Sequence, residues 1–122
     1  MNKKLLTFFL AFFLTLTLYS PAGAYSLQIQ ETFPAAMSLN HAAYIDGSGG
    51  LWTWGRNASG ELGNGSLENS DVPVKVLDDV ADVSLGNGVT AALKTDGSLW
   101  MWGSNQYGQL GNLSLTDSSV PV

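Results

Sequence analysis

The sequence predicts an all-β protein of β-propeller blades, each a small sheet of four antiparallel strands, preceded by a signal-peptide helix. Two observations support the propeller: a repeat of 48 residues, and short β-branched runs separated by glycine-rich turns. No window of the repeats has the 3.6-residue apolar periodicity, with caps, that indicates an amphipathic helix. We expect about one complete blade and one partial blade.

The repeat is clearest in the C-terminal half of the chain. Residues 49–74 align with residues 97–122 without a gap, and 16 of the 26 positions are identical. The alignment fades towards the N-terminus, with no clear partner before about Ala42. We therefore place the repeats in residues 37–122. Residues 25–36 form a lead-in segment that resembles one strand.

The strands of one unit follow from its turns. In the second unit we predict strands over 80–85, 89–94 and 99–102, joined by turns at 86–88 and 95–98, with residues 120–122 beginning a fourth strand, as 72–76 do in the first unit. Such a sheet cannot cover both of its faces, so it must stack against neighbouring sheets.

Two pairs of tryptophans recur at the same place in the repeat. Trp52 and Trp54 are two residues apart, as are Trp100 and Trp102, so each pair projects from one face of its strand. We interpret these indoles as the packing between blades. The alternative is a carbohydrate-binding platform, and the repetition at one blade position favours packing.

Glycine and asparagine shape the loop after each tryptophan strand. Glycine permits the sharp turns that such a loop needs, and these glycines are Gly55, Gly60, Gly63, Gly103, Gly108 and Gly111. Asn57, Asn64 and Asn112 each begin an Asn-x-Ser glycosylation sequon. We expect instead that their side chains shape the loop through hydrogen bonds to the backbone.

With these residues in place, the segment DGSLWMWGSNQYGQLGN, residues 96–112, resembles the signature of the regulator of chromosome condensation repeat family. The matching positions of the second copy are Asp96, Gly97, Trp102, Gly103, Asn105, Gly108, Gln109, Leu110, Gly111 and Val120–Val122. Those of the first copy are Trp54, Gly55, Asn57, Gly60, Leu62, Gly63 and Val72–Val74. Glu61 replaces the usual Gln, Ser48 stands where Asp is expected, and His41 matches a histidine that is often found in the family.

The resemblance implies a seven-bladed propeller, which at this repeat length needs about 340 residues. We therefore expect the chain to be a fragment of about two repeats. The alternative is that several copies of the chain assemble one propeller.

The N-terminus has the layout of a secretory signal peptide. Lys3 and Lys4 precede an uncharged run over residues 5–18, which is followed by Pro21 and the triplet at 22–24. A run of 14 residues is shorter than the roughly 20 that span a bilayer. We expect cleavage after residue 24, no stable membrane span afterwards, and a secreted or cell-surface protein. A retained anchor is the alternative.

Charge limits the partners of residues 25–122. This part carries three cationic side chains against ten carboxylates, a formal charge of −7. Nucleic acid and anionic membranes require a basic surface, so neither is an expected partner. The best-known family member is a nuclear exchange factor for a small GTPase that docks on chromatin, and the predicted export argues against that role here.

Few residues could perform chemistry. The chain has one histidine and no cysteine, which excludes sites built from both. A Ser/His/Asp arrangement would depend on His41, for which a structural role is favoured. Asp78, Asp79 and Asp82 could approach a Ca²⁺ ion, but their spacing lacks a known loop pattern and favours a solvated turn. We predict no cofactor, no metal and no catalytic activity.

The sequence thus indicates an exported interaction scaffold that binds an unknown protein or surface ligand. Its binding surface would lie on the loops at 56–69 and 104–117. The alternative is the non-catalytic propeller part of a larger cell-surface or carbohydrate-active enzyme. Nucleotide exchange on a GTPase is a third possibility, which predicts a cytoplasmic protein.

Overall fold

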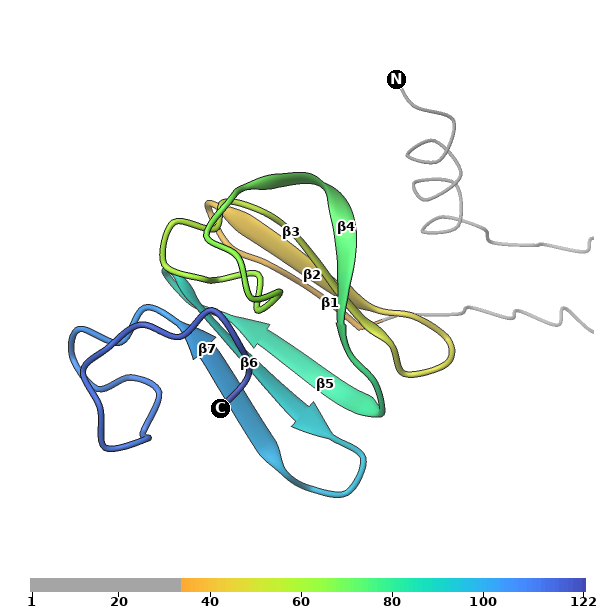
Figure 1. Ribbon diagram of the computed structural model, residues 1–122. Helices are drawn as coiled ribbons and strands as arrows, with labels where there is room; N and C mark the ends of the chain where they lie inside the picture. Colours follow the sequence, from red (N-terminus) through yellow and green to blue (C-terminus); the bar gives the residue numbers. More distant parts are fainter. Residues whose placement is uncertain (1–33) are drawn as a thin grey trace, which may run out of the picture. The chain divides into compact units, whose positions relative to one another are not determined.

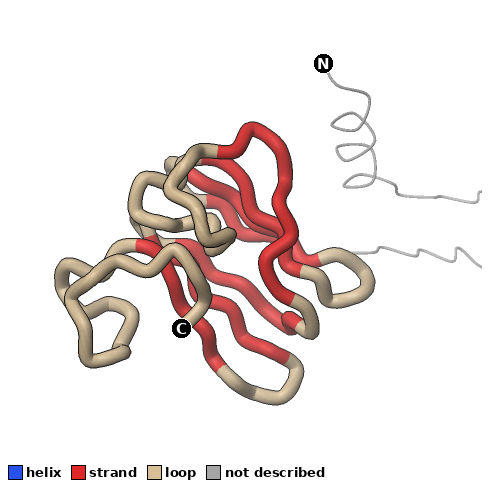
Figure 2. Tube along the Cα trace, in the orientation of Figure 1, coloured by secondary structure: helices blue, strands red, loops and turns tan. Residues whose placement is uncertain are grey.

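The computed structural model describes residues 34–122, and this part of the chain contains seven strands and no helix (Figure 1, Figure 2). The predicted signal-peptide helix and the strand-like lead-in around Leu27 and Ile29 lie outside the described residues. Within the described range, no helix is long and apolar enough to cross a membrane. The prediction of an all-β fold is therefore confirmed for residues 34–122.

The seven strands form two antiparallel meanders (Figure 1). The first sheet has the order β1 (Ala35–Met37), β2 (His41–Ile45), β3 (Leu51–Gly55) and β4 (Ser70–Leu77). The second has the order β5 (Val80–Leu85), β6 (Val89–Lys94) and β7 (Leu99–Gly103). β5 and β6 have the predicted bounds, and β7 is one residue longer than predicted.

The last residues begin a fourth strand in the second sheet, as predicted. Ser118 exchanges two backbone hydrogen bonds with Gly103, and Val122 exchanges two with Met101. In the first sheet, Ser70 and Val74 of β4 take the equivalent positions opposite β3. The two sheets therefore share one pairing register, shifted by 48 residues.

The structural repeat begins earlier than the sequence repeat. β1 pairs Ala35 with Tyr44, and β5 pairs Val83 with Ala92, which are the same positions 48 residues later. The two strands share no identical residue, because backbone pairing does not depend on which side chain is present. β1 thus belongs to the first blade and crosses the boundary that we predicted between residues 36 and 37.

The core lies between the two sheets. The first sheet contributes Ala43, Ile45 and Leu51, and the second contributes Val80, Val83, Ala92 and Trp102. Ala43 and Ile45 come from alternate positions of β2, and an irregularity between Val80 and Asp82 brings Val80 and Val83 to the same face of β5, so each sheet buries one face against the other. This packing is the stacking that the sequence predicted for propeller blades.

Candidate functional site

The loop between β3 and β4 is built around one buried asparagine. The Nδ2 atom of Asn57 donates to the carbonyl oxygens of Ser66 and Glu68, at 2.8 and 3.0 Å, and to Oδ1 of Asn64 at 3.2 Å. Its Oδ1 atom accepts from the backbone N–H of Leu62 at 2.9 Å. One fully buried side chain therefore fixes both halves of a loop that has no regular secondary structure.

The loop after β7 has the same arrangement. Asn105 is fully buried and donates to the carbonyl oxygens of Ser114 and Thr116 at 2.9 and 3.0 Å, and to Oδ1 of Asn112 at 3.2 Å. Its Oδ1 atom accepts from the N–H of Leu110 at 2.9 Å. The prediction that asparagines shape these loops through side-chain hydrogen bonds is confirmed in both copies.

The joint between the two sheets is centred on a backbone carbonyl group. The oxygen of Glu61 accepts from the indole Nε1 of Trp102 at 2.8 Å and from the hydroxyl of Thr90 at 2.7 Å. The carbonyl oxygen of the next residue, Leu62, accepts from the hydroxyl of Thr53 at 2.8 Å. The loop of the first blade is thereby held between β3 of its own sheet and β6 and β7 of the next.

The single histidine belongs to this joint. The Nε2 atom of His41 lies 2.9 Å from Oγ1 of Thr90, and Nδ1 lies 2.8 Å from Oγ of Ser38. Because Thr90 donates its own proton to Glu61, it can only accept from His41, so the imidazole carries its proton on Nε2. Burial lowers the pKa of His41, and the nearby Glu61 carboxylate partly opposes this effect.

Glu61 replaces the glutamine expected from the family pattern without changing its backbone contact. Its Oε2 atom accepts from the N–H of Ser59 at 2.7 Å, as Oε1 of Gln109 accepts from Tyr107 at 2.8 Å. Both residue types supply the required acceptor oxygen. The buried carboxylate also lies 3.9 Å from Nε of Arg56.

The β2–β3 turn compensates for the missing aspartate at position 48. Asp46 accepts from the N–H and hydroxyl of Ser48, from the N–H of Gly50, and from Nε1 of Trp52 at 2.8 Å. These hydrogen bonds hold the pKa of the Asp46 carboxyl well below its usual range. In the second copy Asp96 accepts from Ser98 in the same way, and its pKa is also lowered.

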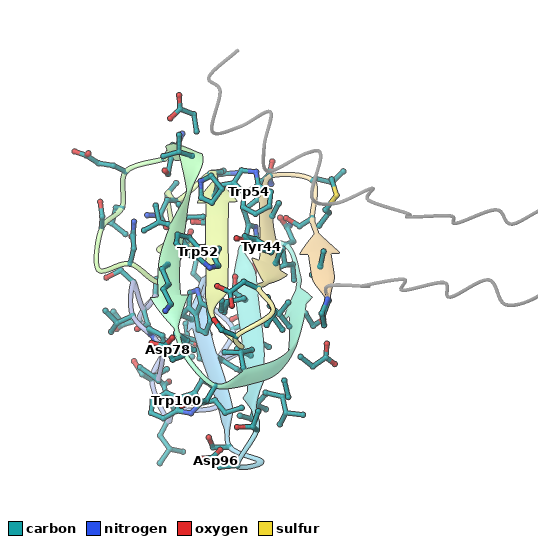
Figure 3. The ribbon with its side chains drawn as sticks, turned by 90° about the vertical axis from the view of Figure 1, so that its right-hand side faces the viewer. Tyr44, Trp52, Trp54, Asp78, Asp96 and Trp100 are labelled. Carbon is teal, nitrogen blue, oxygen red and sulfur yellow. The ribbon has the colours of Figure 1, made fainter. Side chains whose placement is uncertain are left out.

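The prediction that the tryptophans pack between blades is confirmed for Trp102 and wrong for Trp100. Trp102 is fully buried between the sheets, whereas Trp100 is 36% exposed and bonds only locally to the hydroxyl of Ser98. The reason is its position near the hairpin end of β7, which projects past the first sheet (Figure 3). An indole there finds no opposing sheet within residues 34–122.

Trp52 and Trp54 are half-buried on the other face of the first sheet, away from β5–β7. They gather around Tyr44, which stacks on Trp52 with ring centroids 6.3 Å apart and meets Trp54 edge-on at 6.2 Å (Figure 3). A pocket of about 170 Å³ opens beside Trp54. Among residues 34–122, the first pair therefore forms an aromatic face with Tyr44 and does not lie between the two sheets.

The glycines and leucines of the repeat signature have the backbone angles and the burial that the repeat pattern predicts. The six glycines all have positive φ angles, as expected for sharp turns: Gly55, Gly60, Gly63, Gly103, Gly108 and Gly111. Leu62 and Leu110 are both buried beneath their loops. Sequence reasoning missed the donor role of Thr90, since the first copy has Ala42 at that position and the repeat gave no signal.

Among residues 34–122, no group of three or more His, Cys, Asp or Glu side chains could hold a metal ion. Asp78 instead pairs with Lys75, with an Nζ to Oδ1 distance of 2.6 Å. The contacts described above bind loops and sheets to one another.

Two protein-family models match the chain. Residues 48–93 match the Regulator of chromosome condensation (RCC1) repeat, and residues 80–109 match a second model with the same description. The two matches overlap and together cover just over half of the sequence.

Solved structures with a similar fold come from human and yeast. The crystal structure of human WBSCR16 has a TM-score of 0.67 at 24% identity, over 80% of this chain and 27% of that chain. Prp20p from Saccharomyces cerevisiae, described with its binding properties to Gsp1p and histones, has a TM-score of 0.68 at 19% identity, over 79% and 26%. Yeast RCC1 (Prp20) bound to Kap60 has a TM-score of 0.63 at 23% identity, over 80% and 24%. The chain spans about a quarter of each relative, and at these identities the likeness concerns the fold.

Proposed function

Since the chain belongs to the regulator of chromosome condensation (RCC1) repeat family, we propose that it is an exported β-propeller-repeat scaffold that binds a protein partner or surface ligand through its blade loops. In this proposal it has no catalytic activity of its own. The observation that carries the proposal is the set of hydrogen bonds from one buried asparagine to two carbonyl oxygens of its loop, which we call the asparagine cage. It recurs in both long loops, at Asn57 and at Asn105.

The cage presents one exposed leucine in each loop. Asn57 holds the carbonyl oxygens on either side of Leu67, and Asn105 holds those on either side of Leu115. The two leucines are 61% and 69% exposed. A loop that is already ordered loses little conformational entropy on binding, so its exposed apolar side chain can contribute fully to affinity.

A protein is the favoured class of partner. The solved yeast relative is described with Gsp1p, histones and Kap60, all of which are proteins. The acidic composition of residues 25–122 disfavours nucleic acid and anionic membranes. Export is supported by the charged, apolar and small-residue segments of residues 1–24.

The contacts of the histidine support a role without catalysis. Both ring nitrogens of His41 are engaged, and Oγ of Ser38 already accepts from the N–H groups of Asn40 and His41. A serine in this position caps a turn and has no lone pair directed at a substrate. The arrangement is typical of a structural hydrogen-bond network.

Two measurements test the proposal. N-terminal sequencing of the protein from its native host should find a chain beginning at Tyr25 outside the cytoplasm. A retained chain with residues 1–24 intact would contradict export. The labelled protein should bind the surface or secreted proteins of that host, and the double variant Leu67→Ser/Leu115→Ser should bind several-fold more weakly.

The control for the loop variant is Leu39→Ser. Leu39 is fully exposed in the β1–β2 turn and belongs to neither loop, although the N–H of Arg56 bonds to the neighbouring Asn40, so its loss should leave binding through the two loop leucines unchanged. If both variants bind as the parent does, the leucines of the loops do not form the binding surface.

A further inference from the structure

Two asparagines of the chain are followed by glycine, and the fold holds these two pairs differently. One pair is Asn64 and Gly65, in the loop between β3 and β4, and the other is Asn87 and Gly88, in the turn between β5 and β6. Such pairs are chemically labile, because a glycine has no side chain to keep its main-chain nitrogen away from the asparagine carboxamide. The two glycines have similar φ angles, 79° and 75°, so φ does not distinguish them.

The first pair is fixed by hydrogen bonds at both of the groups that would react. The Oδ1 atom of Asn64 accepts from Nδ2 of Asn57 at 3.2 Å and from the N–H of Ser66 at 3.1 Å. The N–H of Gly65 donates to the carbonyl oxygen of Ser119 at 2.8 Å. These hydrogen bonds must break before the nitrogen of Gly65 can reach Cγ of Asn64.

The second pair has no such contacts. Among residues 34–122, neither the carboxamide of Asn87 nor the N–H of Gly88 has a hydrogen-bond partner. Asn87 is also exposed, so water reaches its side chain. Both reacting groups of this pair are therefore free to meet.

The first blade shows why the N–H of Gly88 has no acceptor. At the equivalent place in the first blade, the hydroxyl of Ser38 accepts from the N–H of Asn40 at 3.3 Å. The residue 48 positions after Ser38 is Gly86, which has no side chain. The two turns otherwise match, since each is closed by the same backbone hydrogen bond, donated by Ser38 at 2.9 Å and by Gly86 at 2.8 Å.

The exposure of Asn87 does not depend on where the sequence ends. Leu39 takes the same position in the first blade and is fully exposed. The first blade packs the face that bears Ile45 against its neighbour, and the second blade packs the face that bears Trp102, which are opposite faces of the repeat. Contact with a neighbour on either face therefore leaves this position accessible.

We propose that Asn87 is a site of deamidation. The main-chain nitrogen of Gly88 loses its proton to solvent and bonds to Cγ of Asn87, while the Cγ–Nδ2 bond breaks and the amide nitrogen takes up a proton and leaves as ammonia. Water then opens the resulting cyclic imide at one of its two carbonyl groups, which gives aspartate or isoaspartate. Water is the only other reactant.

The isoaspartate product lengthens the main chain beside the joint between the sheets. It places one extra methylene group in the backbone between residues 87 and 88. The carbonyl oxygen of Gly88 accepts from the N–H of Ser104 at 2.7 Å, and Oε1 of the buried Glu61 lies 3.8 Å from the point that a Cβ at Gly88 would occupy. Deamidation of Asn87 therefore loosens this joint as the protein ages.

Peptide mapping by mass spectrometry tests the site. The folded 122-residue chain is incubated in mildly alkaline buffer, and aspartate and isoaspartate are quantified at positions 64 and 87 over time. Asn87 should convert faster than Asn64 by about ten-fold or more, because the reaction at Asn64 must first break several hydrogen bonds. Equal rates in the folded protein, or a slower reaction at Asn87, would overturn the proposal.

A denatured sample separates the effect of the fold from that of the local sequence. In denaturant the two asparagines should convert at similar rates, since glycine follows each of them. A preference for Asn87 that persists unchanged in denaturant would mean that the fold does not select the site.

A matched pair of variants tests the missing hydroxyl. Gly86→Ser places an acceptor where Ser38 has one, whereas Gly86→Ala adds a side chain without a hydroxyl. A Cβ at position 86 would have its nearest neighbours, both in Val89, at 3.9 Å, so both variants fit. Deamidation of Asn87 should be several-fold slower in Gly86→Ser than in Gly86→Ala. Equal rates in the two variants would show that the unbonded N–H of Gly88 does not control the reaction.

The aged protein tests the effect on the joint. The isoaspartate form, separated by ion-exchange chromatography, should have a lower midpoint of thermal unfolding than Asn87→Asp, which adds the same charge to a backbone of normal length. Equal midpoints would contradict the loosening of the joint. The proposed loop-binding function has a separate readout, because the Leu67→Ser/Leu115→Ser variant should deamidate at the parent rate.

Discussion

The indole nitrogen of Trp102 donates to the carbonyl oxygen of Glu61 across 2.8 Å, and this hydrogen bond ties the second sheet to the loop of the first. Both groups are buried, and Thr90 donates to the same oxygen. Because the acceptor belongs to the backbone, the bond does not depend on the side chain at position 61. It depends on the donor and on space for the ring.

Trp102→Ala should therefore lower the free energy of unfolding by about 3–5 kcal/mol, since it leaves a cavity between the sheets and an acceptor with one donor fewer. Denaturant unfolding measured by circular dichroism gives this value. Trp100→Ala is the matched control, because Trp100 occupies the same strand and is 36% exposed. Its loss should cost less than about 1 kcal/mol. Equal losses for the two variants would contradict burial of Trp102 as the main joint.

A second matched pair tests the space beneath the ring. Gly63→Ala and Gly111→Ala both place a Cβ on a residue with positive φ, 72° and 67°, which costs about 1–2 kcal/mol. Only the Cβ at position 63 meets the indole of Trp102, at 2.6 Å from Nε1. Thermal or denaturant unfolding should show a further loss of about 1–3 kcal/mol at Gly63. If Gly111→Ala is as destabilising as Gly63→Ala, the clash with Trp102 is not the cause.

Much of this fold could be predicted from sequence because the repeat is strict where the backbone is constrained. The strands at 80–85 and 89–94 were predicted with their observed bounds, since glycine-rich turns flank them. The asparagine cage could be anticipated at Asn57 because its partners are local in sequence. Local chemistry of this kind leaves a pattern that one sequence can reveal.

The missed features leave no pattern in the repeat or in the local sequence. Most of β1 fell outside the predicted repeat because its side chains differ from those of β5 while its pairing is the same. The contact of His41 with Thr90 spans 49 residues, and the first copy has no threonine at the equivalent position. The exposure of Trp100 follows from how far one hairpin projects past its neighbour, which no strand pattern encodes.

Asn57→Ala should be strongly destabilising. It leaves the buried N–H of Leu62 without its acceptor and the carbonyl oxygens of Ser66 and Glu68 without a donor, at a cost of about 2–4 kcal/mol. Denaturant unfolding measures the loss, and amide exchange at Leu62 should accelerate. Asn105→Ala removes the same bonds from a loop that no further blade covers within residues 34–122, so water can replace part of them. We therefore expect Asn105→Ala to lower the free energy of unfolding by less than Asn57→Ala does. A larger loss would show that water does not replace these hydrogen bonds.

Folding should become less favourable as the pH falls through the range in which unfolded histidine takes up a proton. Burial lowers the pKa of His41 below its ordinary value of 6.5, so the unfolded state binds the proton at a higher pH than the folded state does. The contribution is present above pH 6.5, decreases as the pH drops below it, and levels off once the folded state is also protonated. Because His41 is the only histidine, His41→Gln isolates the effect, and the glutamine amide can still donate towards Thr90. Unfolding free energies of parent and variant between pH 8 and pH 5, on the order of one measurement per half unit, should diverge in slope around 6.5. A parent protein that gains stability relative to His41→Gln on acidification would mean that the Glu61 carboxylate outweighs burial and raises the pKa of His41.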